Sequence, residues 1–310
     1  MEAIEIHQAT KTYGEITAVN KASFVIPENS LFGLIGPDGA GKTTLFRMIT
    51  TLLLPDEGYV RVFGFDTHED YRQIRLFTGY MPGRFSLYPD LTVQENLSFY
   101  ATIFGTTIKQ HYKLIEPIYA LLEPYKNRLA RNLSGGMKQK LALSCAMIHN
   151  PRLLVLDEPT TGVDAVSRKE FWDTLQQLGK TGMTILVSTP YMDEAVRCGT
   201  VALMQDGVIM LSGKPEKILK DFSGKLLEIK SANLFGLLKI LRSMPEVKSA
   251  YLFGQYIHVT MEPGRSGIDW LKEYLSGQGI KDAKITEIKA DFEDCFISAV
   301  EYIQTEMKHE

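Results

Sequence analysis

The sequence predicts an α/β domain with an antiparallel edge and a helical insert, followed by a smaller α+β domain. The 310 residues are about two domains' worth of chain, since single hydrophobic cores rarely grow past roughly 250–300 residues. Up to residue 222, short apolar runs alternate with amphipathic stretches of helical length. After residues 223–224 the order of strands and helices changes. We therefore expect domains at 1–222 and 223–310.

Composition and charge exclude several classes of protein. Apolar residues make up 45% and charged residues 23% of the chain, which is typical of a folded globular protein and not of a disordered one. The net charge of −3, without a basic block, disfavours a nucleic-acid partner. Cys145, Cys198 and Cys295 have no metal-ligand spacing, so we expect neither disulfides nor a metal cluster. Neither a targeting peptide nor the ~18–20-residue apolar run of a membrane span is evident.

The strands of the first domain are of two kinds. The runs at 31–35, 153–156 and 184–188 are apolar throughout, which is typical of parallel strands buried on both faces. Residues 4–8 and 22–26 alternate instead, as half-buried antiparallel strands do. This combination predicts a parallel core with an antiparallel edge.

A helical subdomain is expected at about residues 90–140. The strand signal disappears between residues 90 and 131, and a helical stretch begins at Thr92. Thr92 and Glu95 have the spacing of a capping box, in which each side chain bonds to the backbone N–H of the other residue. The insert therefore interrupts the α/β pattern.

The C-terminal part has the pattern of a ferredoxin-like domain. The predicted order is strand, helix, two strands, helix, strand and a closing helix, and the ranges are 226–230, 233–244, 249–253, 256–261, 268–276, 284–288 and 292–307. A βαββαβ order of this kind is that of the ferredoxin-like fold.

A glycine-rich loop carries the clearest chemical signal. It follows the strand at 31–35 and opens a helical run, which is the context that a phosphate-binding loop requires. Its glycines let the main chain wrap around phosphates, Lys42 neutralises β/γ oxygens, and Thr43 can ligate Mg²⁺. The nucleotide-binding residues that we predict here are Gly36, Pro37, Asp38, Gly39, Ala40, Gly41, Lys42, Thr43 and Thr44.

Two carboxylates end the apolar strand at 153–156. This pattern resembles a Walker B strand, in which Asp157 holds Mg²⁺ through its water shell. Glu158 is the candidate catalytic residue, because a carboxylate beside the metal can act as general base on the attacking water. Thr43 and Asp157 are thus the predicted metal-binding residues.

A third motif indicates a family. Leu133, Ser134, Gly135 and Gly136 lie between the two nucleotide motifs and lead into a predicted helix at 141–149. This segment resembles the signature of ABC ATPases, and its serine, amides and helix dipole form an anion site. Over essentially its whole length the chain is similar to the ATP-binding subunit (nucleotide-binding domain) of an ABC transporter. The resemblance is to the multidrug and sodium exporters whose permease is a separate polypeptide.

The resemblance implies several further properties. The cofactors are ATP and Mg²⁺, and the activity is a transport-coupled ATPase. The partners are an integral-membrane permease and a second ABC cassette, which binds head to tail so that Ser134, Gly135 and Gly136 close on the partner's ATP. The implied location is cytoplasmic, at the inner face of the cell membrane. Tyr13 is expected to stack on adenine, and residues 162–164 resemble the D-loop.

Two positions depart from the family pattern. The family usually has Gln where this chain has Gly83, and His where it has Pro190. One interpretation is that Arg84 or water substitutes and hydrolysis continues at a lower rate. The other is that the chain's own site is degenerate, because one lost γ-phosphate donor costs about 10²–10³ in rate. An intact signature beside a damaged site favours a heterodimer over a homodimer.

Three other functions are alternatives to that of a transport ATPase. A P-loop kinase or GTPase shares residues 36–43 but has no reason to carry the signature. A non-transport ABC ATPase is expected to show twin cassettes, coiled-coil arms or a basic stripe. A regulatory ATP-binding protein that does not hydrolyse fits Gly83 and Pro190 but not Glu158.

Overall fold

The computed structural model describes residues 1–83, 87–222, 224–262 and 267–306. The chain forms two compact units, Met1–Pro215 and Glu216–Glu310. The division falls before the boundary at 222 that the change of sequence pattern suggests, and Ser223 lies outside the described residues. Each unit is described by itself.

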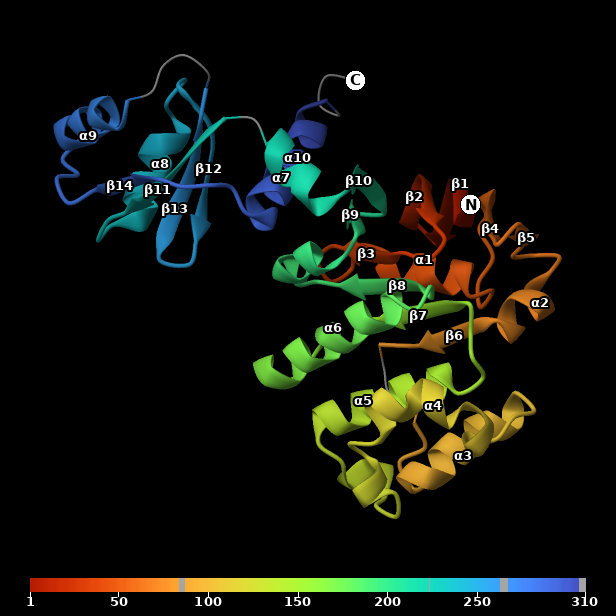
Figure 1. Cartoon of the computed structure of the whole chain (residues 1–310). Coiled ribbons are helices and arrows are strands. Elements are labelled where there is room, and N and C mark those ends of the chain that lie inside the picture. Colours follow the sequence, from red (N-terminus) through yellow and green to blue (C-terminus); the bar gives the residue numbers. More distant parts are fainter. Residues whose placement is uncertain (84–86, 223, 263–266, 307–310) are drawn as a thin grey trace. The chain divides into compact units, whose positions relative to one another are not determined.

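A six-stranded sheet forms the centre of the first unit (Figure 1). Its order is β10-β9-β3-β8-β7-β6, and only β10 runs antiparallel to its neighbour. The bounds are β3 Leu31–Ile35, β6 Thr78–Met81, β7 Leu153–Asp157, β8 Thr184–Thr189, β9 Thr200–Gln205 and β10 Val208–Gly213. Every residue of β3, β7 and β8 is buried. The uniformly apolar runs therefore do form the parallel strands, as predicted.

The predicted antiparallel strands form a sheet of their own. Its order is β2-β1-β4-β5, with β1 Glu2–Tyr13, β2 Ile16–Pro27, β4 Glu57–Val62 and β5 Phe65–Asp66. The first two strands extend well beyond the short alternating runs, because β-bulges let them follow each other past the breaks in alternation.

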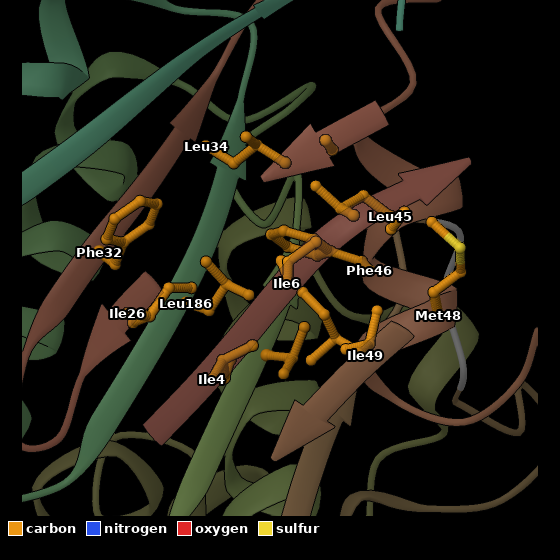
Figure 2. Packing of buried hydrophobic residues seen from close by; sticks show 14 of the residues in the cluster. Ile4, Ile6, Ile26, Phe32, Leu34, Leu45, Phe46, Met48, Ile49 and Leu186 are labelled. Carbon is orange, nitrogen blue, oxygen red and sulfur yellow. The ribbon is translucent and has the colours of Figure 1, made fainter. Parts of the chain in front are cut away.

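Helix α1 (Lys42–Ile49) packs between the two sheets. Leu45, Phe46, Met48 and Ile49 are completely buried in one cluster with apolar side chains of both sheets. Figure 2 shows side chains of α1 meeting those of β1, β2, β3 and β8. This core fixes the start of α1, where the glycine-rich loop ends.

The remaining elements of the first unit flank the sheets. The helical subdomain contains α3 Val93–Ile103, α4 Ile108–Tyr119, α5 Gly135–Met147 and the short turns η1 Glu123–Tyr125 and η2 Ala130–Asn132. The predicted capping box is present, since Thr92 and Glu95 each bond to the other's backbone N–H. The others are α2 Tyr71–Leu76, α6 Ala165–Gly179, η3 Met192–Arg197 and α7 Pro215–Asp221, of which α7 crosses into the second unit.

The second unit has the element order that the sequence predicts. Its elements are β11 Lys225–Lys230, α8 Leu234–Arg242, β12 Val247–Phe253, β13 Tyr256–Met261, α9 Ile268–Gly277, β14 Lys284–Glu287 and α10 Phe292–Glu306. The sheet order is β12-β13-β11-β14, and all neighbours are antiparallel. The ferredoxin-like interpretation of this unit, and the separability of 223–310, remain proposals.

All three cysteines are buried free thiols. Cys145 lies on α5, Cys198 follows η3, and Cys295 lies on α10. Burial raises the pKa of each thiol above its ordinary value.

Candidate nucleotide-binding site

The parallel strands bring the predicted site residues to one edge. The order β3-β8-β7-β6 places the carboxyl ends of four neighbouring strands side by side. Ile35 lies opposite Thr189, Asp157 opposite Ser188, and Met81 opposite Leu156. Segments that lie far apart in the sequence therefore leave the sheet together, where open α/β sheets bind ligands.

The glycine loop requires glycine at two positions for steric reasons. A Cβ on Gly36 would lie 2.1 Å from the Met204 carbonyl oxygen, and one on Gly41 would lie 2.1 Å from that of Ala18. Gly41 also has a φ of 102°, and as N-cap of α1 it offers the helix no side chain. The first amides of α1 therefore have no capping side chain from this residue and suit an anion.

Lys42 is held inside the loop. Its Nζ donates to the carbonyl oxygens of Gly36 at 2.8 Å and Pro37 at 2.9 Å. It also lies 3.2 Å from Glu158 Oε1. The side chain is only 3% exposed, so its charge is concentrated at the loop. A charge-assisted contact to phosphate oxygens is the chemistry that this arrangement favours.

The two carboxylates have different surroundings. Asp157 is buried and accepts a 2.6 Å hydrogen bond from the Ser188 hydroxyl. The backbone N–H of Glu158 donates to the same hydroxyl at 2.9 Å. Glu158 has a φ of 48°, which turns the chain sharply after the strand. Its side chain is partly exposed at the edge of the sheet, as a group that acts on a bound ligand must be.

The predicted Mg²⁺ ligands are oxygen donors. Thr43 lies in the first turn of α1 and Asp157 ends β7. A hydroxyl and a carboxylate belong to the donor set that Mg²⁺ prefers, and few protein ligands suffice because the ion keeps several waters. The residues present therefore fit this cation.

The signature residues form a separate surface. Ser134 is the exposed N-cap of α5 and accepts a 3.3 Å hydrogen bond from the Met137 N–H. A Cβ on Gly136 would lie 2.7 Å from the Ser167 hydroxyl, so glycine allows α5 to approach α6 closely. Asp164, at the predicted D-loop, caps α6 by accepting from the Val166 and Ser167 amides. These amides, Ser167 first, lower the pKa of Asp164.

Tyr13 lies in the other sheet, in a hairpin that touches the loop. It ends β1 opposite Ile16, is 47% exposed, and belongs to the hairpin whose Ala18 carbonyl approaches Gly41. Stacking of this ring on adenine remains a prediction, and the position is compatible with it.

The two unusual positions lie at the same edge. A Cβ on Gly83 would lie 3.2 Å from the Asp157 carbonyl oxygen, so a side chain at this position would lie against Asp157. Pro190 directly follows β8 and has no N–H to offer a phosphate. Arg84, considered above as a substitute, lies outside the described residues.

The sequence reading missed Ser188, Thr189 and Glu194. Ser188 holds both Asp157 and the Glu158 amide, and Glu194 is a buried carboxylate that accepts from Thr189. Ser188 could have been found from the strand register. It lies near the end of the buried strand β8, directly opposite Asp157 of the neighbouring strand β7. Glu194 gave no comparable signal, since a charged residue in a short turn is usually exposed.

Comparison with known proteins identifies the family of this chain. The family model described as "ABC transporter" matches residues 19–161. The Nod factor export ATP-binding protein I of Rhizobium etli is 37% identical over 233 residues, covering 74% of each chain. This chain belongs to the ABC transporter ATP-binding family.

Other comparisons agree with this assignment. The probable multidrug ABC transporter ATP-binding protein YbhF of Escherichia coli K12 is 40% identical over 272 residues, or 86% of this chain. The chain spans only 46% of that relative's length. A solved ABC cassette, dimeric in a post-hydrolysis state with ADP and phosphate, is 26% identical with a TM-score of 0.62. The match covers 68% of this chain and 98% of the solved cassette.

The family assignment confirms the predicted fold and cofactors. The chain is an ATP-binding domain of this family, for which ATP and Mg²⁺ are the cofactors. In the part of the chain that the structure describes, no helix is both long and apolar enough to cross a membrane.

Proposed function

We propose that the chain drives export through a separate integral-membrane permease, to which it binds at the inner face of the cell membrane. Similarity to ATP-binding proteins named for multidrug and Nod factor export supports this proposal. In this proposal the permease is a separate polypeptide, and it selects the transported substrate.

An apolar groove supports a permease partner. It has a volume of about 370 Å³ and lies between the helical subdomain and the end of α1. Leu52 and Ile103 at its rim are 56% and 59% exposed. Inside it, Phe104 and His149 stack with ring centroids 3.7 Å apart, and burial lowers the pKa of His149 to about 4. A largely apolar groove of this kind, which Arg75 also lines, suits a short segment of another protein.

Within this function, we propose that the chain's own ATP site turns over slowly. The observation that carries the proposal is the pair Gly83 and Pro190, which place neither a side-chain amide beside Asp157 nor an imidazole after β8. Lys42, Asp157 and Glu158 support ATP binding and some residual turnover.

A partner of different sequence would complete this arrangement. Ser134 and Gly135 are exposed at the capped start of α5, so they are accessible to a nucleotide held by another cassette. In a homodimer both ATP sites would lack the same two groups. In a heterodimer this signature could close on a partner loop whose γ-phosphate groups are complete, and we favour that assembly.

Restoring the two side chains tests this proposal. Gly83→Gln and Pro190→His are introduced together, and ATP turnover is compared with the parent, alone and with the co-encoded cassette and permease. We expect turnover of the isolated chain to rise by about 10-fold or more, because each donor serves the γ-phosphate region. If the unmodified chain already turns over at ~1 s⁻¹ and restoration adds nothing, the site is not degenerate.

A further inference from the structure

Glu194 is a buried carboxylate on η3, next to the ATP site but outside the family motifs considered above. It is 2% exposed. Its oxygens accept from the Thr160 hydroxyl at 3.0 and 3.2 Å and from the Thr189 hydroxyl at 2.5 Å. The Arg168 guanidinium lies 3.8 Å away. A buried charge is retained at such a position only when several partners compensate its lost hydration.

The two threonines belong to different segments of the site. Thr160 follows the predicted base Glu158 by two residues, and the neighbouring Thr161 hydroxyl lies 3.4 Å from Glu158 Oε2. Thr189 ends β8, immediately before Pro190. Its carbonyl oxygen accepts from the Gly36 amide, the first residue of the glycine loop. One carboxylate therefore connects the segment of the base to the strand end that touches the phosphate-binding loop.

The Thr189 hydroxyl also holds the segment around Pro190, which has no backbone N–H of its own. The Thr189 hydroxyl donates to Glu194 and accepts from the Tyr191 N–H at 3.1 Å, so it fixes the chain on both sides of the proline. Arg168 also stacks over the Tyr191 ring at 4.8 Å. We call Glu194, Thr160, Thr189 and Arg168 the Glu194 cluster. The contacts of this cluster fix the backbone conformation of residues 189–194.

We infer that Glu194 is a positioning residue for ATP hydrolysis, which holds the Glu158 segment in register with the end of β8. It acts through Thr160 and Thr189 and does not touch the nucleotide. Loss of this alignment lowers the rate of the chemical step more than it lowers ATP affinity, because small displacements of a reacting group cost rate steeply. The inference rests on the residual turnover proposed above.

Three variants test the inference. Glu194→Gln keeps the shape, but its amide nitrogen cannot accept a hydroxyl hydrogen bond. Thr160→Val removes one donor at nearly constant volume, whereas Thr160→Ser keeps the hydroxyl. Thr184→Val is the matched control, because Thr184 is a buried threonine at the opposite end of β8. Single-turnover hydrolysis of radiolabelled ATP gives the rate, and a fluorescent ATP analogue gives the affinity.

The expected result separates rate from binding. Glu194→Gln and Thr160→Val each lower the hydrolysis rate at least about tenfold and change ATP affinity less than about threefold. Thr160→Ser restores most of the rate, Thr184→Val leaves it unchanged, and Thr160→Val adds little to Glu194→Gln. The inference is overturned if rate and affinity fall together with the melting temperature, or if both variants stay within twofold of the parent. If the unmodified chain binds ATP but never hydrolyses it, the inference fails as well, while the ATP-binding assignment stands.

Discussion

The Lys42 ammonium group lies 3.2 Å from the Glu158 carboxylate, so the predicted phosphate-binding cation and the predicted base form one ion pair. Lys42 is almost entirely buried, and it keeps two carbonyl contacts in the glycine loop. We expect ATP phosphates that approach this loop to compete with Glu158 for the same ammonium group. Nucleotide binding would then free the Glu158 carboxylate from this ion pair.

Replacing the lysine should weaken ATP binding strongly. In Lys42→Ala the charge-assisted contact to phosphate is lost, and we expect the affinity for a fluorescent ATP analogue to fall at least ~10-fold. Lys180→Ala is the control, because Lys180 is an exposed lysine that caps the far end of α6. Unchanged binding in Lys42→Ala would contradict the assignment of residues 36–44 as the nucleotide site.

Replacing the predicted base should separate binding from hydrolysis. Glu158→Gln keeps the size of the side chain and removes its basicity, so we expect turnover to fall by about 10²-fold or more. ATP affinity should stay equal or rise, since Lys42 loses a competing carboxylate. Phosphate release and analogue titration measure the two quantities. Glu170→Gln, on an exposed residue of α6, should change neither.

The second unit should not be needed for ATP binding. A chain ending at Phe222 retains all of residues 1–215, and we expect it to unfold cooperatively and to bind ATP like the full chain. A chain ending at Pro215 is the matched comparison, because the Cys295 thiol lies 3.8 Å from the Ile218 carbonyl oxygen and so links α7 to α10. Loss of cooperative unfolding in both chains would show that the two parts share one core.

Acid and base should both destabilise the second unit. His258 and Asp294 are buried, and Nδ1 lies 2.7 Å from the carboxylate. Burial is the largest single effect and opposes both charges. The hydrogen bond between the two groups, further hydrogen bonds to Asp294 and the nearby charges together outweigh burial, so the pKa of His258 is raised and that of Asp294 is lowered. The His258 contribution is complete below about pH 6.5 and is lost as pH rises through the folded pKa. The Asp294 contribution is present above about pH 3.9 and is lost as pH falls through its folded pKa.

Removing the imidazole should reveal this contribution. We expect His258→Gln to lower the free energy of unfolding by on the order of 3 kcal/mol at pH 6, and by less at pH 9. Urea unfolding in a Trp172→Phe background reports on the second unit, because Trp270 on α9 is then the remaining tryptophan. His68→Gln, at an exposed histidine, is the control. An equal loss at both pH values would contradict a charged pair.

Much of the site could be predicted because its chemistry depends on local order along the chain. The buried apolar runs ending at Ile35 and Asp157 identify strands, and the residues that follow each strand must lie at the same edge of a parallel sheet. The strand order itself was not predicted, because it depends on contacts between segments separated by more than a hundred residues.

The site residues that the sequence did not reveal have one property in common, which is that they act through partners distant in the sequence. Ser188 and Glu194 matter through their partners across the sheet edge, Asp157 and Thr160, and neither spacing nor composition reveals such pairings. Helix α7 also continues past the boundary of the first unit, because it packs with a segment near the end of the chain. Packing of this kind leaves no local pattern at residue 215.

The burial of all three thiols makes the chain suitable for site-specific labelling. Maleimide dyes react with the thiolate, which burial at Cys145, Cys198 and Cys295 disfavours, so the parent should take up dye slowly. Val166, 69% exposed in the first turn of α6, is a position where one added cysteine would carry nearly all of the dye. Energy transfer between two cassettes labelled in this way would then report their approach in real time, without removal of any native cysteine.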